Sequence, residues 1–158
     1  MKKLFAIAAL AFGLTSAALA QPRAIGARCS LISGEFSYQH NVVSADFLPS
    51  SFGSQFVQAE LGWSDDFFAV HCSYNVVFAN PDWSEGTWNA YLGPSAGLLG
   101  ATGFGGVSIG AMIGLEYTFA SIPLQLSVDA RPDIIILGNN GFDAMRAIYP
   151  AFSVRYAF

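Results

Sequence analysis

Lysine is missing from the sequence after Lys3, and basic residues of any kind are few. The remainder of the chain has five arginines against eleven aspartates and glutamates, a formal net charge of −6. Nucleic-acid binding needs lysine and arginine clustered on one face, so no nucleic-acid partner is expected. Charged residues of both signs make up only 11% of the 158 residues, against roughly a quarter in ordinary soluble domains. So few charges would cover a water-exposed surface poorly, whereas a membrane protein needs few.

A long apolar run is also missing beyond the first twenty residues, although 53% of the chain is hydrophobic. A helix that crosses a bilayer needs roughly 20 consecutive apolar residues. Here the apolar residues are instead spread through short alternating stretches. Because only helices and closed barrels satisfy every backbone group in lipid, this composition predicts an all-β chain that crosses a membrane as a barrel.

The first twenty residues form a separate segment. Lys2 and Lys3 precede the nearly unbroken apolar run from Leu4 to Leu14, and Ala18-Leu19-Ala20 supplies a small-residue cleavage site before Gln21. This order is typical of a secretory signal peptide, and the apolar run is too short for a membrane-spanning helix. We therefore expect residues 1–20 to be removed on export and residues 21–158 to form one domain.

Cysteine is nearly absent, with Cys29 and Cys72 alone. An even pair in an exported chain often indicates a disulfide. The two residues fall on the first and fourth predicted strands, which are not neighbours, and a bridge needs Cα atoms within about 7 Å. We expect two free thiols on the lipid-facing side.

Eight stretches alternate between apolar and polar or small residues, with the period of two that marks a β-strand. They are Arg23–Leu31, Gly34–His40, Gln55–Trp63, Phe68–Phe78, Trp88–Ala96, Val107–Phe119, Ile122–Ala130 and Ala151–Phe158. Repeated alternating segments of about ten residues are typical of outer-membrane barrels. The sequence predicts an eight-stranded antiparallel up-and-down transmembrane β-barrel preceded by a cleaved signal peptide.

The predicted connections are uneven. Those on the external side are 32–34, 64–66, 98–105 and 137–146, and those on the periplasmic side are 41–54, 79–86 and 120–121. Periplasmic turns are usually short, so the segment from Asn41 to Ser54 is unusual.

Seven charged residues fall on the predicted inner face. They are Arg28, Glu35, Glu60, Glu116, Asp129, Arg131 and Arg155. Lone buried charges are very costly, so we expect a paired network, with Arg131 and Arg155 beside Glu116 and Asp129 on neighbouring strands. An eight-stranded lumen has room only for side chains, so this network is interpreted as polar filling and not as a transport or catalytic site.

Catalytic and cofactor motifs are weak. His71 and Ser73 share one predicted strand, about 7 Å apart along the backbone, with Glu60 on the neighbouring strand. That spacing is too long for a direct Ser-His hydrogen bond. The segment "GATGFGGVSIG" (residues 100–110) precedes a strand, whereas a nucleotide-binding loop follows one. No catalytic residue, metal or cofactor is predicted.

Aromatic residues gather near the predicted strand ends, where the girdles of membrane barrels lie. They are Trp63, Trp83, Trp88, Tyr117, Phe119, Tyr156 and Phe158. The terminal strand "AFSVRYAF" carries Phe152, Val154, Tyr156 and Phe158 on its apolar face.

The segments "ISGEFSYQH", "GTWNAYLGPSAGL", "IGAMIGLEYTFASIPLQLSVDARP" and "FSVRYAF" together resemble the small outer-membrane β-barrel proteins of Bacteroidetes. Better-known barrels of similar type are the OmpX- and OmpA-like proteins. The resemblance implies insertion into outer-membrane lipid, with the terminal strand read by the barrel-assembly machinery, and no defined enzymatic activity.

Three function classes remain open. The first is a monomeric structural or surface-binding barrel of the outer membrane, with an unnamed extracellular partner. The second is an outer-membrane lipid-modifying enzyme, which would need a polar cluster facing lipid. The third is a soluble, lipocalin-like exported ligand carrier, with apolar residues inside. The direction of the alternation separates the first from the third, because charges inside indicate a membrane barrel and charges outside a soluble one.

Overall fold

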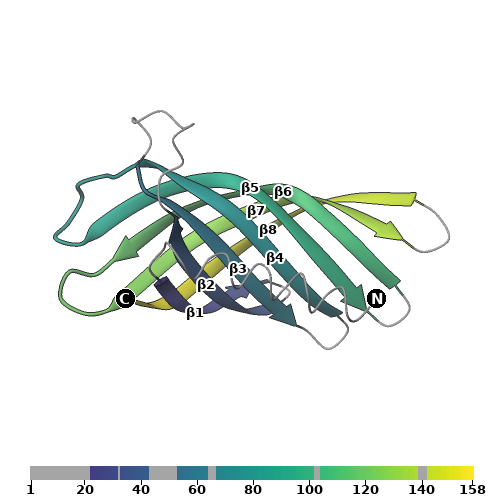
Figure 1. Cartoon of the computed structure of the whole chain (residues 1–158), viewed down its shortest axis with the longest axis horizontal. Helices are drawn as coiled ribbons and strands as arrows, with labels where there is room; N and C mark the ends of the chain where they lie inside the picture. The colour runs from purple at the N-terminus through teal and green to yellow at the C-terminus, as the bar shows by residue number, and fades with distance from the viewer. Residues whose placement is uncertain (1–21, 32, 43–52, 64–66, 102–103, 139–141) are drawn as a thin grey trace.

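The computed structural model describes residues 22–31, 33–42, 53–63, 67–101, 104–138 and 142–158. These residues form a closed antiparallel barrel in which each strand pairs with its neighbours in chain order and β8 pairs back to β1 (Figure 1). The strands are β1 Pro22–Ser30, β2 Gly34–Val42, β3 Gln55–Trp63, β4 Phe67–Ala79, β5 Thr87–Ala101, β6 Phe104–Thr118, β7 Leu124–Gly138 and β8 Phe142–Ala157. The predicted all-β class, the eight strands and their antiparallel order are confirmed. Within the described ranges there is no helix long and apolar enough to cross a membrane.

Side chains alternate across the barrel wall because successive residues of a pleated strand point to opposite faces. On β7, Ser127 and Asp129 are buried inside the barrel while Val128 between them is 61% exposed. The same holds on β8, where Ser153 and Arg155 are buried and Val154 is exposed. The barrel therefore has a polar inside and an apolar outside.

The two ends of the barrel differ. We call the end where β1, β3, β5 and β7 finish the loop end, and the opposite end the turn end. Strands β1 to β3 have nine residues each, whereas β5 to β8 have fifteen or sixteen. β8 pairs with β1 only as far as Ala151, opposite Ser30, so residues 142–150 pair with β7 alone. The β7–β8 hairpin consequently extends beyond the rim formed by the short strands (Figure 1).

Two predicted loops are wrong. Residues 98–101 and 104–105 belong to β5 and β6, and residues 137–138 and 142–146 belong to β7 and β8. The alternation disappears there because the sequence becomes glycine-rich in one hairpin and apolar on both faces in the other. Backbone pairing nevertheless continues. The predicted connection at 79–86 is close to the gap between β4 and β5, and the one at 120–121 lies in the gap between β6 and β7. Most of the unusual segment 41–54 lies outside the described residues, and Asn41 and Val42 belong to β2.

Glycine on the inner face allows close contacts across the wall. A Cβ atom added at Gly93 would lie 1.7 Å from the backbone oxygen of Tyr74, on the neighbouring strand β4. At Gly114 it would lie 2.4 Å from the ring of Tyr91, which packs over the glycine from β5. These positions have space for backbone only.

An apolar cluster fills the lumen toward the turn end. Phe56, Val77, Tyr91 and Met112 are each 1% exposed or less. The rings of Phe56 and Tyr91 pack edge to face with centroids 5.2 Å apart, a favourable arrangement for aromatic pairs. We call these four residues the turn-end plug.

Candidate functional site

Arg28, on β1, is the centre of the charged group in the lumen. Its Nη1 donates to Glu35 Oε2 at 2.6 Å, and its Nη2 donates to Asp129 Oδ1 at 2.6 Å. Glu60 Oε1 lies 3.2 Å from the Arg28 Nε. Arg28 is fully buried and the three carboxylates nearly so. Such charge-assisted bonds are stronger than bonds between neutral groups, and here they join β1, β2, β3 and β7 across the lumen.

Arg131, on β7, is the second cation of this group. It forms ion pairs with Glu60, with Glu35 Oε1 at 3.4 Å and with Asp133 Oδ2 at 3.2 Å. Asp133 also accepts a hydrogen bond from Ser95 Oγ at 3.1 Å. We define the loop-end cluster by its two arginines and four acids: Arg28, Arg131, Glu35, Glu60, Asp129 and Asp133.

Arg23 closes the turn end. The register of β1 against β2 shifts between Pro22 and Ala24, and a bulge of this kind re-aims a side chain. The Arg23 guanidinium lies 4.2 Å from the centre of the Phe56 ring, where a cation–π contact is favourable, and forms an ion pair with Glu116. Glu116 also accepts a hydrogen bond from Asn89 Nδ2 at 2.8 Å. Arg23 therefore covers the turn-end plug.

Arg155 lies inside the barrel but does not have the partners that were expected. Its Nε donates to Ser37 Oγ at 3.0 Å, and its other nitrogens donate to Ser127 Oγ at 2.8 Å and Ser153 Oγ at 3.0 Å. The predicted pairing of Arg131 and Arg155 with Glu116 and Asp129 is wrong. Asp129 pairs with Arg28 and Glu116 with Arg23 instead, because long side chains in a narrow lumen reach strands that are not neighbours.

All seven charged residues assigned to the inner face from the sequence are buried in the structure. Six of them lie in or beside the two ion-paired groups, and Arg155 lies among neutral groups. Sequence reasoning missed two members of these groups, Arg23 and Asp133. The signal for Asp133 is present in the sequence, since it is two residues beyond Arg131 on the same face, but the predicted seventh strand ends at Ala130.

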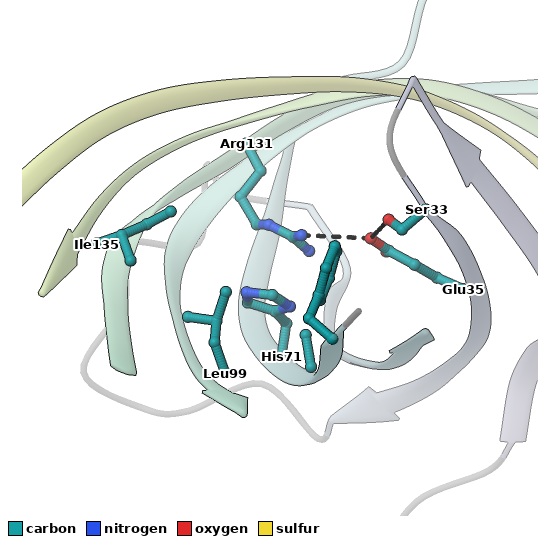
Figure 2. A pocket seen from close by; sticks show the side chains of 8 residues that line it. Ser33, Glu35, His71, Leu99, Arg131 and Ile135 are labelled. Atoms are coloured by element: carbon teal, nitrogen blue, oxygen red, sulfur yellow. Dashed lines mark hydrogen bonds and ion pairs between the residues drawn. The ribbon is translucent and has the colours of Figure 1, made fainter. Parts of the chain in front are cut away.

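A hollow opens at the loop end beside the loop-end cluster (Figure 2). The space between its lining residues is about 330 Å³ and includes open solvent. Arg131, Glu35 and Ser33 point toward one another on one side of it, and His71, Leu99 and Ile135 line the other (Figure 2). Its polar lining residues are Ser33, Glu35, His71 and Arg131. Its apolar lining residues are Phe67, Ala69, Leu99 and Ile135. Ser33 and Glu35 lie at the start of β2, and the other six lining residues come from the longer strands β4, β5 and β7.

His71 and Ser73 face the lumen but do not form a catalytic pair. Ser73 Oγ accepts a hydrogen bond from Asn75 Nδ2 at 2.8 Å. The ring of His71 occupies the space beside Gly97, and its Nε2 lies 3.9 Å from Asp133 Oδ2. In the part of the chain that the structure describes, no group of three or more His, Cys, Asp or Glu side chains is placed to hold a metal ion. Cys29 and Cys72 are free, which confirms the predicted absence of a bond between them.

The residues assigned to the assembly signal lie on the outer surface. Phe152, Val154, Tyr156 and Phe158 are each between 43% and 68% exposed, and the last two rings pack edge to face at 5.3 Å. A second aromatic group at the turn end joins four rings: Trp83 contacts Trp88, Trp88 contacts Tyr117, and Tyr117 contacts Phe119. At the loop end, Trp63 and Phe68 pair across β3 and β4 and are about half exposed.

Comparison with known proteins gives no family to assign. No protein-family model, no curated protein and no solved structure matches the chain.

Proposed function

We propose that the chain is a small integral outer-membrane β-barrel with a filled lumen, exported by means of the signal peptide at residues 1–20. Its role is structural or surface-binding, without catalysis. The observation that carries the proposal is the inside-out arrangement of side chains. Arginines and carboxylates are buried in the lumen, while large apolar residues such as Ile109, Ile113 and Val128 are half exposed on the outside. A soluble carrier barrel needs the reverse arrangement to bind an apolar ligand in water.

The size of the apolar band supports the same proposal. On the outer face of β6, apolar residues run from Val107 to Tyr117. Ten residue steps of about 3.3 Å, tilted by about 40°, give a height of about 25 Å. This is the height of the apolar band on outer-membrane barrels. Aromatic residues lie near both ends of the band, as interfacial girdles do.

A closed lumen argues for a surface role and against a pore. The turn-end plug and the pair Arg23–Glu116 fill one half of the barrel, and the loop-end cluster crosses the other. We propose outer-membrane lipid as the surroundings of the barrel. The barrel-assembly machinery is the proposed partner during insertion, with the exposed residues of β8 as its recognition signal.

The test is membrane fractionation in a Gram-negative host, with the full chain expressed from its own start. We expect the protein in the outer-membrane fraction, resistant to extraction by urea and released by detergent. In gels it should migrate differently before and after heating, as folded barrels do. Recovery of the protein as a soluble periplasmic monomer would contradict the proposal.

A further inference from the structure

The strands of the barrel are staggered around its circumference. Cys29 on β1 pairs directly with Phe152 on β8. Followed in the opposite direction, from pair to pair through β2 to β7, the row that begins at Cys29 arrives at Phe142, ten residues earlier on β8. Each residue step along a tilted strand covers about 2.5 Å of the barrel axis, so each step to the next strand, from β1 toward β8, rises by about 3 Å toward the loop end.

This stagger makes the wall lower at β1 than at β6. On β6 the apolar outer face begins at Val107, which pairs with Ile136 on β7, and Ile136 pairs with Ala144 on β8. β8 is paired with β1 only from Ala151 onward, seven residues beyond Ala144, and the partner of Ala151 is Ser30. The seven residues descend by about 18 Å, and the three steps from β6 to β1 rise by about 9 Å. Ser30, the last residue of β1, therefore lies about 9 Å closer to the turn end than Val107.

Above the end of β1, the edge of β8 that faces away from β7 has backbone groups without a partner strand. The Phe158 N–H donates to the Arg23 oxygen on β1, and the register of β8 is continuous with both neighbours. Because backbone groups alternate between the two sides of a strand, the even-numbered residues of β8 face β1. In the described part of the chain, no strand pairs with Ile148 on this side. Pro150 has no N–H to donate, which is typical of proline on a sheet edge.

A bilayer with its boundary at the level of Val107 all around the barrel would submerge this edge. Ile148 is four residues beyond Ala144 on β8, which places it about 4 Å below Val107. Acyl chains offer no hydrogen-bond partner, and open sheet edges do not occur within the hydrocarbon region. The turn after β1 is polar as well, because the Ser30 N–H donates to the Ser33 oxygen at 3.0 Å and the two hydroxyl oxygens lie 2.9 Å apart. Both the edge and the turn therefore need water or lipid headgroups beside them.

We propose that the barrel indents the leaflet at the loop end, so that lipid headgroups and water reach down to the end of β1. Hydrogen bonds from headgroups and water satisfy the backbone groups of Ile148 and the carbonyl oxygen of Pro150, and acyl chains cover the outer wall below. Local thinning of a bilayer has only a modest cost. This inference rests on the proposed function, because it requires that the barrel spans a bilayer, and its test separates the two.

The experiment measures the depth of a nitroxide spin label on the mature chain in phosphatidylcholine vesicles. Cys72→Ala leaves Cys29 as the one thiol of the chain, exposed on the outer face of β1. The matched control is Ala111→Cys on β6, in a chain with both cysteines replaced by alanine, because Ala111 lies four residues below Val107 and hence at about the height of Cys29. A water-soluble nickel chelate on both sides of the membrane is excluded from hydrocarbon, so it should relax the label at Cys29 about threefold faster than the label at Ala111. The relaxation at Cys29 should equal that of a label at Val107.

The outcomes distinguish the indentation from the proposed function. Labels at Cys29 and Ala111 that are equally shielded would overturn the indentation and leave the membrane barrel in place, whereas labels that are equally accessible would overturn both. Amide hydrogen exchange of the unlabelled chain in lipid nanodiscs decides the matter without a label. The Ile148 amide should exchange rapidly with water, and the Phe152 amide, which faces Cys29 in the sheet, should be protected. An Ile148 amide as protected as that of Phe152 would contradict the indentation.

Discussion

At the scale of single residues, Arg28 and Arg155 are both buried arginines with different surroundings. Arg28 lies between carboxylates, whereas Arg155 donates to serine hydroxyls. Arg28→Ala leaves carboxylates buried without their cation, so we expect the free energy of unfolding to fall by about 3–5 kcal/mol. Arg155→Ala leaves neutral groups unpaired and should cost about 1–3 kcal/mol. Urea titration of both variants in detergent measures the difference.

A control for these two variants is Glu85→Ala, which removes an exposed charge between β4 and β5. Its free energy of unfolding should stay within about 0.5 kcal/mol of that of the parent protein. An Arg155→Ala variant at least as unstable as Arg28→Ala would mean that Arg155 balances lumen carboxylates from a distance.

Alternation in the sequence indicates which charged residues face inward, and the seven predicted to do so are buried in the structure. The alternation does not indicate which of these charges pair. Arg28 meets Asp129 across the lumen, from strands that are not adjacent. Strand neighbours can be read from chain order, whereas contacts across a lumen depend on side-chain length and barrel diameter. Arg23 was missed because a bulge shifts the alternation by one residue.

At the scale of the strand, two of the three glycines of β5 allow the same substitution to be compared in different surroundings. A Cβ at Gly93 would collide with the backbone oxygen of Tyr74 at 1.7 Å, while one at Gly100 meets nothing within 4 Å. Gly93→Ala should therefore prevent β4 from pairing with β5 and abolish the folded, heat-modifiable band. Gly100→Ala should fold as the parent does. A folded Gly93→Ala variant with an unchanged urea midpoint would contradict this account of the close approach.

The exposed ring of Phe158 provides a test of β8 as an assembly signal. Phe158→Ala removes a ring that is 68% exposed, and Phe36→Ala on β2 removes one that is 44% exposed. If Phe158 is recognised during insertion, its variant should assemble poorly in cells yet refold in detergent, while the Phe36 variant should do both. Pulse-chase measurement of heat-modifiable protein compares them. Equal assembly of the two variants would remove Phe158 from the signal.

Strand existence could be predicted from the sequence, but the ends of the long strands could not. The segment Ile134 to Ile136 is apolar at every position. Above the rim, Ile135 lines the hollow and Ile134 faces outward, so both faces are apolar and the period of two vanishes from the sequence. The hollow itself could not be predicted, because it depends on strands of unequal length standing opposite one another.

At the scale of the whole molecule, a filled lumen should not conduct ions. The purified protein in a planar lipid bilayer is expected to show no stepwise conductance. The double variant Arg23→Ala/Phe56→Ala removes the cover of the turn end and one ring of the turn-end plug. Ion leakage is therefore expected in this variant first. Stepwise conductance by the unmodified protein would mean that the lumen opens in the membrane.

The pairing of β1 with β8 has a consequence for folding kinetics. Seven residue pairs, from Ala24↔Ala157 to Ser30↔Ala151, join the two most distant strands of the chain. Bringing such distant segments together costs chain entropy before any contact is gained. The pairing of β1 with β8 therefore forms late, after the strands from β1 to β8 have paired in chain order into a sheet with two unpaired edges. During that interval the edges can pair with other chains, so aggregation competes with closure in proportion to protein concentration.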